Sequence, residues 1–193
     1  MTPRHELPTP GAAAELAASL GGLLPRIATE RLVLRAPVLS DFPACAEIAC
    51  DERGRFVGGP MSRDDAWSEF TAMTATWLLH GHGGFTIEDA ATDEVLGFVV
   101  LGLEPGDHEV ELGFALTEAA EGKGIAQEAA LAVREWAEAE LGLTELVSYI
   151  DPKNAQSIAL AERLGAQRDP TAEAIVGEGT FVFRHPRPEG GRS

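Results

Sequence analysis

The hydrophobic pattern of the chain changes its period near residue 120, and this change constrains the fold more than any other feature. Three alternating runs, at 84–89, 95–103 and 109–116, are separated by turns and predict an antiparallel meander of three strands. Apolar residues then recur at helical spacing from Ile125 to Ala137, and Gly142 follows as a helix terminator. A strand therefore runs into a short loop and directly into a helix.

The flanking segments add further strands and helices. Strands are predicted at 31–37, 145–150 and 179–185, and helices at 41–50, from Ser62 to about 80, and 154–165. Ser40 or Asp41 is expected to cap the first helix, and Ser62 with Asp65 imitates a capping box. The order implies an α/β (α+β) fold with a mixed, mostly antiparallel central sheet of about six to seven strands and helices on both faces.

The chain length suits one globular domain with a sizeable core, because 45% of its 193 residues are hydrophobic. We assign this domain to residues 28–185. Residues 1–27, rich in Ala, Gly, Leu and Pro, are expected to form a loosely ordered extension, and residues 186–193 a flexible tail.

The formal charge of −16 disfavours binding to nucleic acid, which needs clustered Lys and Arg. An amine-bearing or cationic partner suits this charge better. No apolar run is long enough to cross a bilayer, and Cys45 and Cys50 lack the spacing of a metal site, so we expect a cytoplasmic protein without membrane contact. His80 and His82 are interpreted as loop residues, and no metal is expected.

The loop between the third strand of the meander and the helix reads EGKGIA at 121–126. It lacks the third glycine of a dinucleotide fingerprint and the Ser or Thr of a P-loop. Free N–H groups at the helix start and flexible glycines still favour an anion. From these residues alone, a phosphate cradle and a tight turn remain open alternatives.

Two blocks of residues together resemble the GNAT superfamily of N-acetyltransferases. Residues 121–126 are similar to its coenzyme A signature, although Glu121 stands where the family has Gln or Arg. About thirty residues later, NAQSIALAERLGA is similar to a second family helix, with Ala166 in place of a Phe. RLVLR and ELGFAL resemble the RimJ/RimL-type branch, the ribosomal-protein-alanine N-acetyltransferases. The resemblance covers nearly all of 28–185.

This resemblance implies acetyl-CoA as the acyl donor. The residues that it assigns to the pyrophosphate are Glu121, Gly122, Lys123, Gly124, Ile125 and Ala126. Main-chain groups of Leu112, Phe114, Ala115 and Leu116 would bind the pantetheine arm, with a backbone N–H near Phe114 facing the thioester oxygen. Asn154 would bind the pantetheine amide or cap its helix, and Arg163 would contact the adenosine end or lie in solvent.

Catalytic roles are assigned to three further side chains. Glu109 and Glu111 share one face of a predicted strand, because side chains repeat every two residues. Glu111 matches the family's general base, and either accepts the amine proton or holds the amine by charge, whereas Glu109 is expected to be solvated. Ser157 is our first candidate for the acid that protonates the leaving thiolate, and Tyr149 the second. A thiolate also leaves well without an acid.

The function implied is an acetyl-CoA-dependent N-acetyltransferase that lets a primary amine attack the thioester directly in a ternary complex. The acceptor would be a protein N-terminal α-amine or a small amine, such as a basic protein N-terminus, a polyamine or an aminoglycoside. The alternatives are a non-catalytic acyl-CoA-binding or sensor module and another nucleotide-binding α/β domain. The protein is expected to be a monomer or a homodimer.

Overall fold

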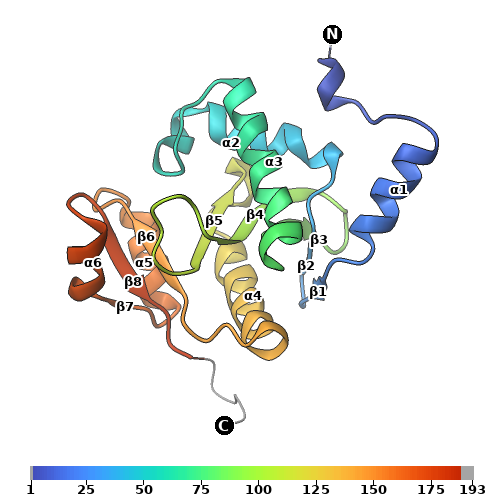
Figure 1. The fold of residues 1–193 in the computed structure, drawn as a ribbon. Helices are drawn as coiled ribbons and strands as arrows, with labels where there is room; N and C mark the ends of the chain where they lie inside the picture. Colours follow the sequence, from blue (N-terminus) through green and yellow to red (C-terminus); the bar gives the residue numbers. More distant parts are fainter. Residues whose placement is uncertain (1, 188–193) are drawn as a thin grey trace.

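The computed structural model describes residues 2–187, which form a sheet of eight strands flanked by helices (Figure 1). The strands are β1 Arg26–Ala28, β2 Leu32–Arg35, β3 Gly84–Asp89, β4 Val95–Gly102, β5 Glu111–Leu116, β6 Val147–Ile150, β7 Gln167–Arg168 and β8 Phe181–Arg184. Their order is β1-β2-β3-β4-β5-β6-β8-β7, and every neighbouring pair is antiparallel except β5 and β6. The meander β3–β4–β5 is confirmed, and the sequence pattern did not indicate the short strands β1 and β7.

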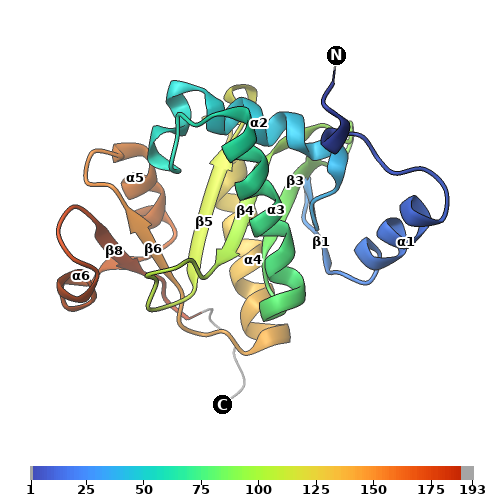
Figure 2. The same cartoon turned by 45° about the horizontal axis from the view of Figure 1, so that its top comes forward.

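Helices cover both faces of the sheet, as predicted. They are α1 Ala12–Gly21, α2 Phe42–Cys50, α3 Arg63–His80, α4 Ile125–Leu141, α5 Ala155–Arg163 and α6 Pro170–Val176, with short 3-10 turns η1 Arg4–Glu6, η2 Leu39–Asp41, η3 Glu52–Phe56 and η4 Glu118–Ala120. α3 crosses one face of the central strands and α4 lies behind them (Figure 2). The core against α4 is built around Val133, and a second core holds α2 and α3 against Phe98.

Local sequence signals explain where the long helices begin and end. The Ser62 hydroxyl accepts the Asp65 N–H at 3.1 Å and donates to the Asp65 carboxylate at 2.6 Å, which confirms that this pair opens α3. Gly124 and Gly142 flank α4 with φ of 78° and 68°. These left-handed conformations favour glycine, so α4 begins and ends where the sequence predicts.

Asp41 is the N-cap residue of α2, one of the two residues expected there, but its carboxylate does not bond to the N–H groups of that helix. The side chain is buried and instead accepts two hydrogen bonds from Arg35, at 2.7 and 3.0 Å, and one each from the Thr86 hydroxyl and the Val38 N–H. Arg35 also donates to Glu88 at 2.7 Å. A buried carboxylate needs such partners, so this cluster ties β2, β3 and the start of α2 together.

The first residues of the N-terminal segment contact α3. The Glu6 carboxylate accepts two hydrogen bonds of 2.7 Å from Arg63, and the His5 ring lies 4.8 Å from the Trp67 ring. Helix α1 buries none of its residues. At the other end, residues 188–193 of the predicted tail lie outside the described residues. Within 2–187, no helix combines the length and apolar character that a membrane span requires.

We predict that Asp41→Ala lowers the free energy of unfolding by about 3–5 kcal/mol, because it leaves the partly buried Arg35 without its main partner. Urea denaturation followed by circular dichroism measures this loss. The control is Glu145→Ala, which removes an exposed ion pair with Arg187 and should cost about 1 kcal/mol or less. Equal losses in the two variants would contradict a stabilising role for the cluster.

Candidate functional site

The parallel strands β5 and β6 separate soon after they meet. Their only register pair in the described structure joins Glu111 and Val147, with a hydrogen bond of 3.1 Å from the Val147 N–H to the Val110 carbonyl. Figure 2 shows the two strands diverging towards their carboxyl ends. The sheet therefore contains a gap between two of its central strands.

The edge of β5 along this gap carries main-chain groups without a strand partner. The carbonyls of Val110 and Leu112 both face β6, and the alternation of a strand turns the main-chain groups of Phe114 and Leu116 the same way. The Leu112 carbonyl is occupied, because it accepts a hydrogen bond of 2.6 Å from the Ser148 hydroxyl. The free edge therefore begins beyond Leu112.

Ser148 stands at the point where the strands separate. Its single hydroxyl proton goes to Leu112, so the His185 Nε2, 2.9 Å away, must be the donor in the second contact. His185 is thus the neutral Nε2–H tautomer, and burial, with the nearby Arg134 charge, lowers its pKa to about 4. A side chain, rather than a strand, satisfies the Leu112 carbonyl, which lets β6 turn away from β5.

The glycine loop continues from the carboxyl end of β5 and has the geometry of an anion site. Gly122 and Gly124 have φ of 70° and 78°, and no atom lies within 4 Å of where a Cβ on Gly122 would stand. Among residues 2–187 no side chain caps α4, so the N–H groups of its first turn are free. Ile125 and Ala126 are buried, and only their backbone can face a ligand.

Two arginines that the sequence analysis did not single out lie at this loop. Arg31 donates to the Lys123 carbonyl at 3.1 Å and to Glu128 of α4 at 2.7 Å. Arg53, on η3, lies against the Glu121 carboxylate and 3.5 Å from the Leu116 carbonyl. The unexpected Glu121 thus carries its own cationic partner, and the exposed Lys123 adds a third positive charge.

Glu111 is the partly buried acid at the point where β5 and β6 separate. Burial raises the pKa of its carboxyl to about 7, and the negative charges of Asp107 and Glu104 act in the same direction. The Tyr149 N–H, 3.4 Å from Oε1, favours the charged form. A carboxyl with such a pKa accepts protons effectively near neutral pH.

Glu109 differs from the expectation of a solvated acid. It precedes β5, and its carboxylate accepts hydrogen bonds of 2.6 and 2.8 Å from Arg184 on β8. These bonds lower the pKa of Glu109. The expectation was wrong because Arg184, 75 residues away in the chain, cannot be placed beside Glu109 from the sequence.

The remaining predicted site residues lie on β6 and α5. The side-chain oxygen Oδ1 of Asn154 accepts the Ser157 N–H at 3.1 Å and so caps α5, while the side-chain amide N–H groups of Asn154 have no partner within 2–187. Ser157 is partly buried, and Arg163 is exposed. The Tyr149 hydroxyl accepts N–H groups of His108 and Glu109 at 3.4 and 3.3 Å, which leaves its own proton free to be donated.

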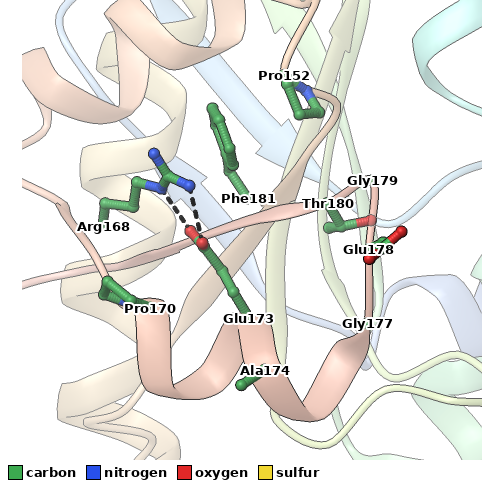
Figure 3. A pocket seen from close by; sticks show the side chains of 10 residues that line it. All are labelled: Pro152, Arg168, Pro170, Glu173, Ala174, Gly177, Glu178, Gly179, Thr180 and Phe181. Atoms are coloured by element: carbon green, nitrogen blue, oxygen red, sulfur yellow. Dashed lines mark hydrogen bonds and ion pairs between the residues drawn. The ribbon is translucent and has the colours of Figure 1, made fainter.

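Two other features lie away from this region. Figure 3 shows a surface hollow formed by α6, β7 and β8, where Glu173 accepts two hydrogen bonds from Arg168, and none of the predicted site residues lines it. His82 is buried with its Nδ1 2.8 Å from the Leu101 carbonyl, consistent with a loop residue. No cluster of three metal-ligating side chains occurs within 2–187.

Comparisons with known proteins agree with this geometry. The model of the acetyltransferase (GNAT) domain matches residues 31–167. An uncharacterized N-acetyltransferase of Bacillus subtilis, YnaD, is 24% identical over 148 residues, which cover 74% of this chain and 83% of YnaD. The crystal structure of an acetyltransferase from Agrobacterium tumefaciens is 39% identical and has a TM-score of 0.80, with 85% of this chain and 95% of that one covered.

A ribosomal L7/L12 α-N-protein acetyltransferase, RimL, in complex with coenzyme A shares the fold at 20% identity, with a TM-score of 0.62 and coverage of 83% of this chain and 96% of RimL. The resemblance to RimL-type proteins is thereby confirmed at the level of the fold. Because the family model spans most of the sheet and the glycine loop, the chain belongs to the GNAT family of acetyltransferases and is an N-acetyltransferase.

Proposed function

We propose that the chain transfers an acetyl group from acetyl-CoA to a primary amine of a basic acceptor in the gap between β5 and β6. The observation that carries the proposal is the position of Glu111, whose pKa is about 7, beside a strand edge with unpaired main-chain groups. The edge suits a pantetheine arm, which carries amides that can pair as an added strand does. The glycine loop and its three cations suit the pyrophosphate.

Acetyl-CoA supplies an activated thioester, so the amine forms a C–N bond to its carbonyl carbon while the C–S bond breaks. The protein has to remove one proton from the amine, stabilise charge on the carbonyl oxygen and receive a thiolate. The Phe114 N–H, on the free edge of β5, is our candidate donor to that oxygen. One such donor contributes about 3 kcal/mol to transition-state stabilisation in other enzymes.

Glu111 is our candidate for the group that takes the proton. Its carboxylate can act directly or through one water, and near pH 7 it changes readily between its two forms. The carboxylate also attracts an incoming ammonium before deprotonation. Asp107, Glu104 and, on α3, Glu69 extend this negative field. Burial raises the pKa of Glu104, and the charges of Glu69 and Asp107 raise it further.

The negative field supports a cationic acceptor on the α3 side of the sheet. Nearby Ala115 packs against the core formed by α2 and α3, and β5 alternation places Glu111 on the same face. RimL, which shares the fold, is described as acting on the α-amine of a ribosomal protein. We therefore place a basic protein N-terminus first, ahead of polyamines and aminoglycosides.

The thiolate has two candidate proton donors, and the contacts now rank them differently. The Tyr149 hydroxyl accepts two N–H groups and keeps its own proton to donate, on the strand that also supplies the N–H to Glu111. Burial raises the pKa of Tyr149, which keeps it protonated. Ser157 has no such arrangement, so we propose Tyr149 first.

We predict that Glu111→Gln lowers kcat/KM for the amine by about 100-fold or more, because general-base catalysis of this kind contributes 10²–10⁴. Thiol release from acetyl-CoA measures the rate. In the wild type, kcat/KM should rise with pH through about 7. In the variant, the rise of kcat/KM that is due to Glu111 should disappear, and only the rise due to deprotonation of the amine should remain. Glu109→Gln, matched in chemistry, should keep most of the turnover, and equal losses in both would contradict the assignment.

We predict that the same variant is more stable than the wild type at pH 8. The folded state raises the pKa of Glu111 above its ordinary value of 4.5, so the folded state binds a proton more tightly than the unfolded chain. Wild-type stability therefore falls as pH rises from about 4.5 to 7. In urea denaturation, the free energy of unfolding of Glu111→Gln should exceed that of the wild type by about 1–3 kcal/mol at pH 8. At pH 4 the two free energies should be equal. A constant difference would contradict the raised pKa.

We predict thiol release with at least one basic acceptor from a panel of peptides, polyamines and aminoglycosides. N-acetylated versions of the peptides, without lysine, are the control, because they keep the sequence but lack the nucleophile. Release with every amine in proportion to its basicity would contradict a selective acceptor site. Coenzyme A binding without release for any amine would instead favour a non-catalytic acyl-CoA-binding module.

A further inference from the structure

We propose that Arg53 is a coenzyme A-binding residue, which brings to the pyrophosphate the positive charge that residue 121 does not provide. The inference rests on the proposed function and extends it to a residue outside the glycine loop. Arg53 lies on η3, between α2 and α3, 68 residues from Glu121 in the chain. Arg53 would therefore link the α3 side of the sheet, where we place the acceptor, to the glycine loop.

The position of Arg53 is determined by three contacts. The Asp51 carboxylate accepts the Arg53 N–H at 3.0 Å and holds the start of η3. The guanidinium Nη2 then reaches the Leu116 carbonyl at 3.5 Å and the Glu121 carboxylate. It therefore lies between the last residue of β5 and the first residue of the glycine loop. If the pantetheine arm of coenzyme A binds along β5, the cofactor passes Arg53 before it reaches the free N–H groups of α4.

Arg53 has more unused donors than Arg31, the other arginine at the loop. All three guanidinium nitrogens of Arg31 are engaged, by Glu128 and by the Lys123 carbonyl. In Arg53 only Nη2 has a partner within 2–187, so Nε and Nη1 remain free to donate to phosphate oxygens. A guanidinium presents five N–H donors in a fixed plane, a geometry that matches phosphate.

Glu121 and Arg53 have opposite effects on a bound phosphate. A carboxylate at the rim of the loop repels the pyrophosphate, and pairing with Arg53 cancels that repulsion. The chain as a whole carries a formal charge of −16, so it must concentrate positive charge at this loop to bind an anion. Removing Arg53 therefore exposes Glu121, while removing the charge of Glu121 releases Arg53 for the ligand.

The test measures Kd for coenzyme A by isothermal titration calorimetry in Arg53→Ala, Glu121→Gln and a control, Arg55→Ala. Arg55 lies on the same 3-10 turn, with its guanidinium 4.6 Å from the Phe56 ring. Arg53→Ala should weaken binding by roughly 10- to 100-fold, the range expected for hydrogen bonds to charged groups. Glu121→Gln should tighten it several-fold, and Arg55→Ala should leave it unchanged.

A second acetyl donor distinguishes a variant that has lost the pyrophosphate contact from one that has lost its structure. Acetylpantetheine carries the same thioester but no pyrophosphate, so the three variants should use it with wild-type kcat/KM. Wild-type affinity of Arg53→Ala for coenzyme A would overturn the inference and leave the proposed function standing. An equal loss with acetylpantetheine would also overturn it. Failure of the wild type to bind coenzyme A would overturn both the inference and the proposed function.

Discussion

β5 and β6 separate beyond Glu111 and Val147, and the candidate site lies along the gap between them. A central strand of a sheet normally has its main-chain groups satisfied on both edges, because an unpaired buried N–H or carbonyl is costly. In the part of the chain that the structure describes, β6 pairs with β5 only at Glu111 and Val147, and the Ser148 hydroxyl takes the place of the next backbone partner. The end of β5 is left to be satisfied by something outside the sheet.

The separation of β5 and β6 also explains the chemistry of Glu111. The residue lies at the last point where the two strands are paired, so its carboxyl is partly enclosed by protein yet adjoins the gap. Burial and neighbouring negative charges raise its pKa, whereas Glu109, two residues earlier, is held in its charged form by Arg184. Two carboxyl groups with the same local pattern thus acquire different properties from their long-range partners.

Charge is distributed in keeping with two ligands of opposite sign. The glycine loop gathers Arg31, Arg53 and Lys123 in a chain that is otherwise strongly acidic. The connection between β4 and β5 carries Glu104 and Asp107 beside Glu111. The two regions are separated by the length of β5, so an anionic donor and a cationic acceptor would meet at the gap without competing for the same charges.

Features encoded within a few residues could be predicted from the sequence, and features that depend on distant contacts could not. The boundaries of α3 and α4 follow from Ser62, Gly124 and Gly142, each of which acts on its own neighbours. The Glu109 interpretation failed because its partner, Arg184, lies 75 residues away, and the hydrogen bonds of Asp41 include one from Thr86, 45 residues away. The departure of Glu121 from the family signature was the one signal that another cation should be sought, although it did not identify Arg53.

If coenzyme A completes the edge of β5, amide hydrogen exchange resolved by residue should show it. Without ligand, the Phe114 and Leu116 N–H groups should exchange faster than those of β4, because no strand covers them. Added coenzyme A should slow them together with the N–H groups of 122–127. Binding that leaves these groups unprotected, and instead protects α6 and β8 around the hollow in Figure 3, would contradict the account.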